Sequence, residues 1–93
     1  MIARRLVIRG HVQGVGYRYA MIETAEALGV TGWVRNRREG TVEAFVQGEP
    51  ARIDSIVTWC RRGPPSARVD AIDTTVMAAD PAIDSFEHRP TEP

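Results

Sequence analysis

The apolar and polar positions of the chain follow two periods that alternate along its length. Residues 4–12 repeat at every second position, with Leu6 and Ile8 on one side, which predicts a β-strand. Residues 18–28 repeat at every third or fourth position instead, which predicts a helix with one apolar side. Gly29 follows this helix and suits its end. The apolar stripe of the helix consists of Met21, Ala25 and Leu28.

The middle of the chain has the pattern of a β-hairpin. Residues 32–37 and 41–47 are both strand-like, and the turn between them is short. Gly40 in that turn suits a positive φ, which hairpin turns often require. The apolar side of the second of these strands consists of Val42, Ala44 and Val46.

The second half of the chain begins with another helix. Pro50 suits a first helical turn, and the Gly-Pro-Pro sequence of residues 63–65 ends the helix. Residues 67–77 predict a fourth strand whose alternation slips by one position, which indicates a β-bulge. Residues 86–89 predict at most a short terminal strand, and 91–93 a frayed tail. The apolar stripe of the second helix consists of Ile53, Ile56, Val57 and Cys60.

These elements follow the order β-α-β-β-α-β. Each helix has an apolar stripe that needs a sheet to cover it, so the expected fold is α+β. The predicted arrangement is a ferredoxin-like α/β sandwich, in which both helices lie on one face of an antiparallel sheet. Right-handed crossovers make the first and third strands the central pair. We expect one domain over residues 1–93, with the segment between the first strand and the first helix at the end of a central strand.

Composition and charge narrow the classes of function. The 93 residues carry twelve basic and twelve acidic side chains, so the formal net charge is zero, which argues against a broad nucleic-acid footprint. Every basic residue is an arginine, which excludes Schiff-base chemistry on lysine. Cys60 is the only cysteine, so no internal disulfide forms. No apolar run approaches the length of a membrane span. We therefore expect a cytoplasmic protein that contacts no membrane.

The segment Gln13 to Arg18, "QGVGYR", has three features that favour a compact oxyanion. It leads into a helix N-terminus, where backbone N–H groups are unpaired. Its glycines, Gly14 and Gly16, let successive N–H groups turn inward as an anion nest. Arg18 adds a planar fork that suits two oxygens of a phosphate or carboxylate. The segment matches neither a Walker A loop nor G-x-G-x-x-G. A tight turn with a solvated arginine fits the spacing equally well.

Two spaced motifs resemble the acylphosphatase family. They are "GHVQGVGYR" at residues 10–18 and "GWVRN" at residues 32–36. Further counterparts are "GTVEAFVQG" at 40–48, "ARVD" at 67–70 and the late Phe86. The resemblance therefore covers nearly the whole chain.

The resemblance implies a ferredoxin-like α/β sandwich that hydrolyses carboxyl-phosphate bonds. It implies that Arg18 binds the phosphate and that Asn36 positions the attacking water. It also implies a small-molecule acyl phosphate as substrate, inorganic phosphate as product, and no metal or cofactor. We also expect the protein to be a monomer that binds no nucleic acid. The loop whose backbone amides hold the phosphoryl oxygens matches Gln13, Gly14, Val15, Gly16 and Tyr17, leading into Arg18.

Two positions depart from the family pattern. Tyr17 stands where the family commonly has Phe, and we expect it to pack in the interior. His88 stands where the family tends to have an aliphatic residue, and we expect a structural or solvated side chain.

Other residues have two interpretations each. Asn36 also suits the start of the hairpin turn, and His11 is either a surface histidine or a general base. The hairpin arginines either form a solvated face or attract anionic substrates. Cys60 is expected to be buried and inert because it lies on the core stripe. The hairpin arginines are Arg35, Arg37 and Arg38, and the residues expected to pack are Trp33 and Trp59.

Two other functions remain compatible with this fold class. An RNA-binding module would carry aromatic side chains on its middle strands. Here the first strand has none and the third has only Phe45. A regulatory domain could instead bind an anion without turnover. Hydrolysis of an acyl phosphate distinguishes the enzyme from both.

Overall fold

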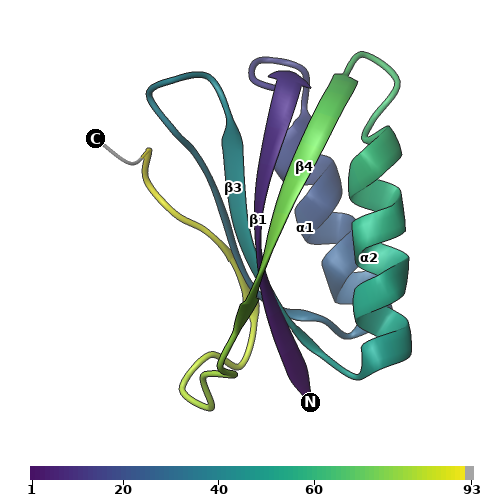
Figure 1. Ribbon diagram of the computed structural model, residues 1–93, viewed down its shortest axis with the longest axis vertical. Helices are drawn as coiled ribbons and strands as arrows, with labels where there is room; N and C mark the ends of the chain where they lie inside the picture. The colour runs from purple at the N-terminus through teal and green to yellow at the C-terminus, as the bar shows by residue number, and fades with distance from the viewer. Residues whose placement is uncertain (92–93) are drawn as a thin grey trace.

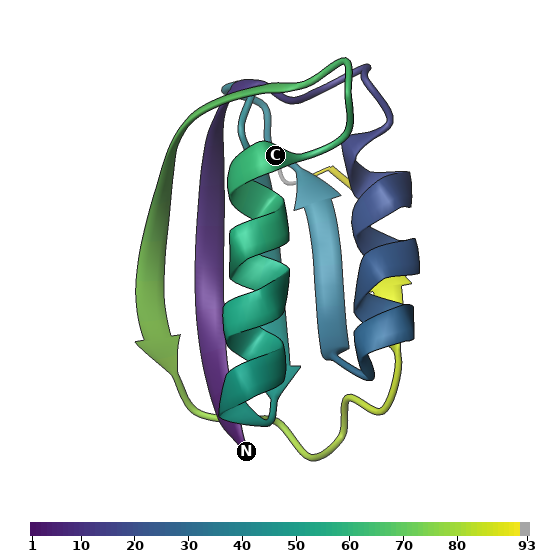
Figure 2. The ribbon, with the colours of Figure 1, turned by 90° about the vertical axis from the view of Figure 1, so that its right-hand side faces the viewer.

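The computed structural model describes residues 1–91 and forms two layers. A five-stranded sheet makes one layer, and two helices pack on one of its faces (Figures 1 and 2). Residues 92 and 93, most of the predicted tail, lie outside the described residues. The elements are β1 (Ile2–His11), α1 (Tyr17–Leu28), β2 (Thr31–Asn36), β3 (Val42–Gly48), α2 (Pro50–Arg62), β4 (Arg68–Met77) and β5 (Phe86–His88).

The sheet has the order β4-β1-β3-β2-β5, so β1 and β3 are central, as predicted. The four longer strands pair antiparallel, which confirms the ferredoxin-like arrangement. The short terminal strand differs, because β5 pairs with β2 in parallel and makes the complete sheet mixed. The reason is the path of the chain. From β4 at one edge, residues 78–85 cross to the other edge and turn back, so β5 runs against β4 and along β2.

The core lies between the helices and the sheet. Met21 and Ala25 of α1 are fully buried, as are Ile56 and Cys60 of α2. These side chains cluster with the apolar side of β3, and the predicted stripes are confirmed. Gly29 ends α1 in the left-handed conformation at φ 70°, also as predicted. The β3 members of the core are Val42, Ala44 and Val46.

A bulge interrupts the pairing of β1 with β4. The register shifts between Arg9, which faces Ala71, and Gly10, which faces Val69, so Asp70 is the extra residue. This confirms the slip predicted for the fourth strand. A Cβ at Gly10 would collide with the carbonyl oxygen of Arg68. The bulge increases the local twist at the end of β1, where the chain turns toward α1.

Within residues 1–91, neither helix has the length and apolar character needed to cross a membrane.

Candidate active site

Three strands, β1, β2 and β5, have their C-terminal ends at the same end of the sheet. β1 and β2 both run antiparallel to β3, and β5 runs along β2, so all three point the same way. The connection from β1 to α1 and the end of β2 therefore lie together at the top of Figure 2. This arrangement brings both sequence motifs to one end of the molecule.

The segment Gln13 to Arg18, here called the glycine loop, exposes its backbone. Gly14 and Gly16 have φ values of 74° and 79°, in the left-handed region. A Cβ at either glycine would meet nothing within 4 Å, so conformation and not space requires glycine there. Both glycines face open solvent, which leaves room for a ligand.

The backbone donors of the glycine loop have no protein partner. The first hydrogen bond of α1 runs from Ala20 N to Gly16 O at 3.1 Å. Before it, no backbone N–H from Gln13 to Arg18 donates to an acceptor in the part of the chain that the structure describes. No side chain caps this end of α1, and its first turn has no acidic residue. The partial positive charge of the helix end is therefore uncompensated.

Tyr17 fastens the end of the loop to the interior. Its side chain is 1% exposed, and its hydroxyl donates to Cys60 O at 2.7 Å. Burial raises the pKa of this hydroxyl well above its ordinary value. The ring lies 5.4 Å from that of Trp59, at a tilt. Tyr17 therefore packs as expected and contributes only its backbone to the loop surface. Burial likewise raises the pKa of the Cys60 thiol to about 12, so this thiol is inert.

Gln13 ties the glycine loop to the hairpin. Its Nε2 donates to Arg37 O at 2.8 Å and to Thr41 O at 2.9 Å. Both carbonyls belong to the turn region that follows Asn36. The position of the loop is thereby coupled to the end of β2.

Asn36 is the last residue of β2 and pairs with Val42. Val42 is fully buried under the helices, so Asn36 lies on the same face of the sheet. The Oδ1 of Asn36 is buried and accepts no hydrogen bond within residues 1–91. An unsatisfied buried acceptor is costly and is a feature of functional sites.

Arg18 is the second residue of α1, and its side chain extends to β5. Its Nη1 lies 2.5 Å from Nε2 of His88. Within the described residues no carboxylate pairs with Arg18, so its charge is not neutralised. His88 in turn pairs with Val34, two residues before Asn36. Our sequence interpretation of His88 as structural or solvated missed this contact, although its departure from the aliphatic family pattern was a signal.

Two of the hairpin arginines, Arg35 and Arg37, are partly buried and do not form the solvated face that we considered, whereas Arg38 is exposed. Glu43 is 3% exposed and lies at their centre. Its carboxylate accepts from Arg5 Nε at 2.5 Å, from Arg35 Nε at 2.7 Å and from Arg37 Nη1 at 3.3 Å. Arg37 also pairs with Glu39 at 3.0 Å. The charges of these arginines are largely balanced locally, because a buried carboxylate requires partners.

The remaining candidate, His11, is the exposed last residue of β1, two positions before the glycine loop, and pairs with Arg68 on β4. Within the described residues, no hydrogen bond joins the side chain of His11 to Arg18, Asn36 or the glycine loop. Among the described residues, no group of three or more His, Cys, Asp or Glu side chains is arranged to hold a metal ion.

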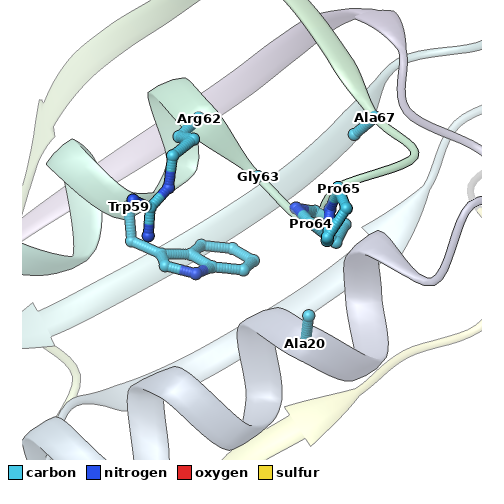
Figure 3. A pocket seen from close by; sticks show the side chains of 7 residues that line it. All are labelled: Ala20, Trp59, Arg62, Gly63, Pro64, Pro65 and Ala67. Carbon is cyan, nitrogen blue, oxygen red and sulfur yellow. The ribbon is translucent and has the colours of Figure 1, made fainter.

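A hollow of about 480 Å³ lies between the two helices. Figure 3 shows Trp59 and Arg62 extending from α2 and Ala20 facing them from α1. Neither Arg18 nor Asn36 lines this hollow, and none of its walls is acidic. It therefore lacks the combination of groups found at the glycine loop. The other walls are Gly63, Pro64, Pro65 and Ala67.

Comparison with known proteins gives matches over nearly the whole chain. A family model described as Acylphosphatase matches residues 4–88. The chain is 45% identical over 92 residues to Acylphosphatase 1 of Ralstonia nicotianae, covering 98% of this chain and 90% of the relative. It is 48% identical over 92 residues to an acylphosphatase of Acidovorax sp., covering 97% and 92%.

Solved structures give the same result. The acylphosphatase from Bacillus subtilis superimposes with a TM-score of 0.91 at 31% identity, covering 96% of this chain and 99% of that one. An acylphosphatase from Coxiella burnetii gives a TM-score of 0.90 at 32% identity, covering 95% and 92%.

Proposed function

The chain belongs to the acylphosphatase family, and we propose that the glycine loop, Arg18 and Asn36 carry out its reaction. It hydrolyses the carboxyl-phosphate bond of acyl phosphates, taking an acyl phosphate and water to a carboxylate and inorganic phosphate. One observation carries the site assignment: unpaired loop amides, an arginine without a carboxylate and an unsatisfied asparagine oxygen gather where β1, β2 and β5 end.

The phosphoryl group binds to the glycine loop in this proposal. Backbone N–H groups at a helix N-terminus favour anions, and successive amides turned inward form a nest for phosphate oxygens. The left-handed conformations of Gly14 and Gly16 support this role. Arg18 supplies the full positive charge, and its fork can bind two oxygens. These donors are in position before the substrate arrives, so they stabilise the charge of the transition state without reorganisation.

Asn36 orients the attacking water. Its amide group both accepts and donates hydrogen bonds, and its unsatisfied Oδ1 supports a bond that forms only with a ligand or water present. The leaving group is a carboxylate, which needs no general acid. The proton of the water passes to a substrate oxygen, so no protein base is required. Neither segment 10–18 nor segment 32–36 contains a carboxylate, which agrees with this route.

Further parts of the proposal concern the state of the protein. Phosphoryl transfer is mainly a problem of positioning and charge stabilisation, and Arg18 with the loop amides supplies both, so we propose that the reaction uses no metal or cofactor. We also propose that residues 1–93 act as one domain and as a monomer in the cytoplasm, without nucleic acid or membrane. The zero net charge supports the absence of nucleic acid, and the single buried free cysteine supports a location in the cytoplasm.

The test compares Arg18→Ala and Asn36→Ala with the wild type on acetyl phosphate and benzoyl phosphate. Arg18→Ala is expected to weaken inhibition by inorganic phosphate and to lower turnover. Asn36→Ala is expected to lower kcat by about 100-fold or more while phosphate inhibition is kept. The exposed Arg38, changed to Ala, is the matched control and keeps wild-type kinetics. Loss of phosphate affinity in Asn36→Ala with normal kcat would invert the two roles.

A further inference from the structure

The hollow between the two helices, here called the interhelix hollow, is separate from the proposed active site and has a chemistry of its own. It lies where α2 ends and α1 begins, with Trp59 and Arg62 on one side and Ala20 on the other (Figure 3). Ala20 presents only a methyl group, so the space between the helices stays open. The volume of about 480 Å³ lies within the range of small-molecule sites.

The apolar walls of the interhelix hollow are rigid. The indole of Trp59 is half-buried, and its centroid lies 5.4 Å from the ring of the buried Tyr17, which fixes its position. Pro64 and Pro65 line the same space, and their rings lock the backbone φ. Gly63 leaves the floor bare, because a Cβ there would lie 2.8 Å from Cε2 of Tyr17. These fixed, flat surfaces bind a planar apolar group at little cost in entropy.

Arg62 gives the interhelix hollow its charge. It is the one charged residue among the walls in the part of the chain that the structure describes. Its side chain is exposed, and no carboxylate of residues 1–91 pairs with it. The end of α2 contributes a partial negative charge of about half a unit, which the full charges of Arg61 and Arg62 exceed. The planar fork of Arg62 therefore remains available to bind both oxygens of a carboxylate.

We propose that the interhelix hollow binds a planar aromatic carboxylate, at a site distinct from that of the phosphoryl group. The ring lies against Trp59 and the two prolines, and the carboxylate accepts two hydrogen bonds from Arg62. One negative charge matches one guanidinium. A phosphate monoester, with a charge near minus two, would leave about one charge uncompensated beside the carbonyl end of α2. The inference does not depend on the roles assigned to Arg18 and Asn36.

Titration of the isotope-labelled protein with naphthoate, followed by two-dimensional NMR, tests the proposal. The expected result is a saturable shift of the indole N–H of Trp59 and of the backbone N–H groups of Ala20 and Gly63. Arg62→Ala is expected to raise the Kd about fivefold or more, because the bidentate contact is lost. Arg61→Ala is the matched control, since it removes the same charge from the same turn of α2 but does not line the hollow. Its Kd should stay within about twofold of the wild-type value.

Two further probes separate the contributions of the ring and the charge. Cyclohexanecarboxylate keeps the charge without the planar ring, and naphthamide keeps the ring without the charge. Each is expected to bind about fivefold more weakly than naphthoate or weaker still. Equal binding of either probe, or equal losses in Arg61→Ala and Arg62→Ala, would overturn the proposed site. Shifts confined to residues 13–18 would place the carboxylate at the glycine loop and would overturn it as well, whereas hydrolysis by Arg18→Ala tests the proposed function separately.

Discussion

The guanidinium of Arg18 and the imidazole of His88 are in contact, with Nη1 and Nε2 separated by 2.5 Å. The two residues are 70 positions apart in the chain. Arg18 has five N–H donors and no acceptor, and a carboxylate in the place of His88 would neutralise it. A neutral imidazole instead fixes the direction of the side chain and leaves its charge for the substrate.

His88→Leu is therefore expected to disorder the side chain of Arg18, while the leucine still fills the space that the imidazole occupied. The inhibition constant of inorganic phosphate and the KM should both rise about 3–10-fold, the equivalent of one hydrogen bond of typical net strength. His88→Gln retains a neutral acceptor and is expected to restore values within about twofold of wild type. If Leu and Gln behave alike, His88 only fills space. Steady-state kinetics with phosphate as competitive inhibitor measures the difference.

Gln13→Ala should uncouple the glycine loop from the end of β2. We expect a clear fall in kcat, because the loop loses its fixed position relative to Asn36. The loss of stability should be only about 1 kcal/mol, since Arg37 O still accepts from Gly40 N and Thr41 O from Arg37 N. Phosphate release and urea denaturation measure the two effects separately. Gln13→Ala with wild-type turnover would show that the two segments hold their positions independently.

The parts of the fold that depend on local periodicity were predictable. The stripes of both helices, the turn at Gly40 and the bulge in β4 each leave a pattern within a few neighbouring residues. Crossover handedness then placed β1 and β3 at the centre of the sheet. The parallel pairing of β5 was not predictable, because three residues carry no pattern and the path of residues 78–85 is set by the rest of the fold.

Long-range side-chain contacts at the site also left no local pattern. The amide of Gln13 reaches across 24 and 28 residues to the hairpin, and nothing near it in the sequence indicates those partners. Glu43 alternates with buried valine and alanine side chains, which is typical of a solvent-facing position. It is buried because its arginine partners come from β1 and from the β2 hairpin, and only the assembled sheet brings them together.

Gly16→Ala tests why the loop contains glycine. At φ 79° an L-residue is strained by about 1–2 kcal/mol, although no atom obstructs the new Cβ. We expect that loss of stability together with a larger loss of turnover, because relaxation of the strain turns the loop amides away from the phosphoryl group. Gly32→Ala is the contrasting variant, since its Cβ would collide with Phe45 O. It should destabilise the sheet severely. Thermal unfolding and phosphate release distinguish the two.

The carboxylate of Glu43 should make the stability of the protein sensitive to acid. Burial by itself raises the pKa of Glu43, but hydrogen bonds from Arg35 and Arg5 and their charges hold that pKa below its ordinary value. Because the pKa is lowered in the folded state, the stabilisation is complete above the unfolded value of about 4.3. It is lost as the pH falls through the folded pKa, where Glu43 becomes protonated in both states.

Glu43→Gln is therefore expected to unfold more easily than the wild type at pH 7, by about 1–3 kcal/mol. The difference between the two proteins should shrink below about pH 4, because Glu43 loses its charge there and the glutamine has no charge to lose. Urea denaturation at several pH values between 7 and 2.5 measures the free energy of unfolding for both. Glu49→Gln is the control, because the pair of Glu49 with Arg52 is exposed and spans 4.0 Å, and surface pairs of this kind contribute little. A difference that stays constant down to the lowest pH would mean that the network stabilises the fold through shape and hydrogen bonding, independently of the charge of Glu43.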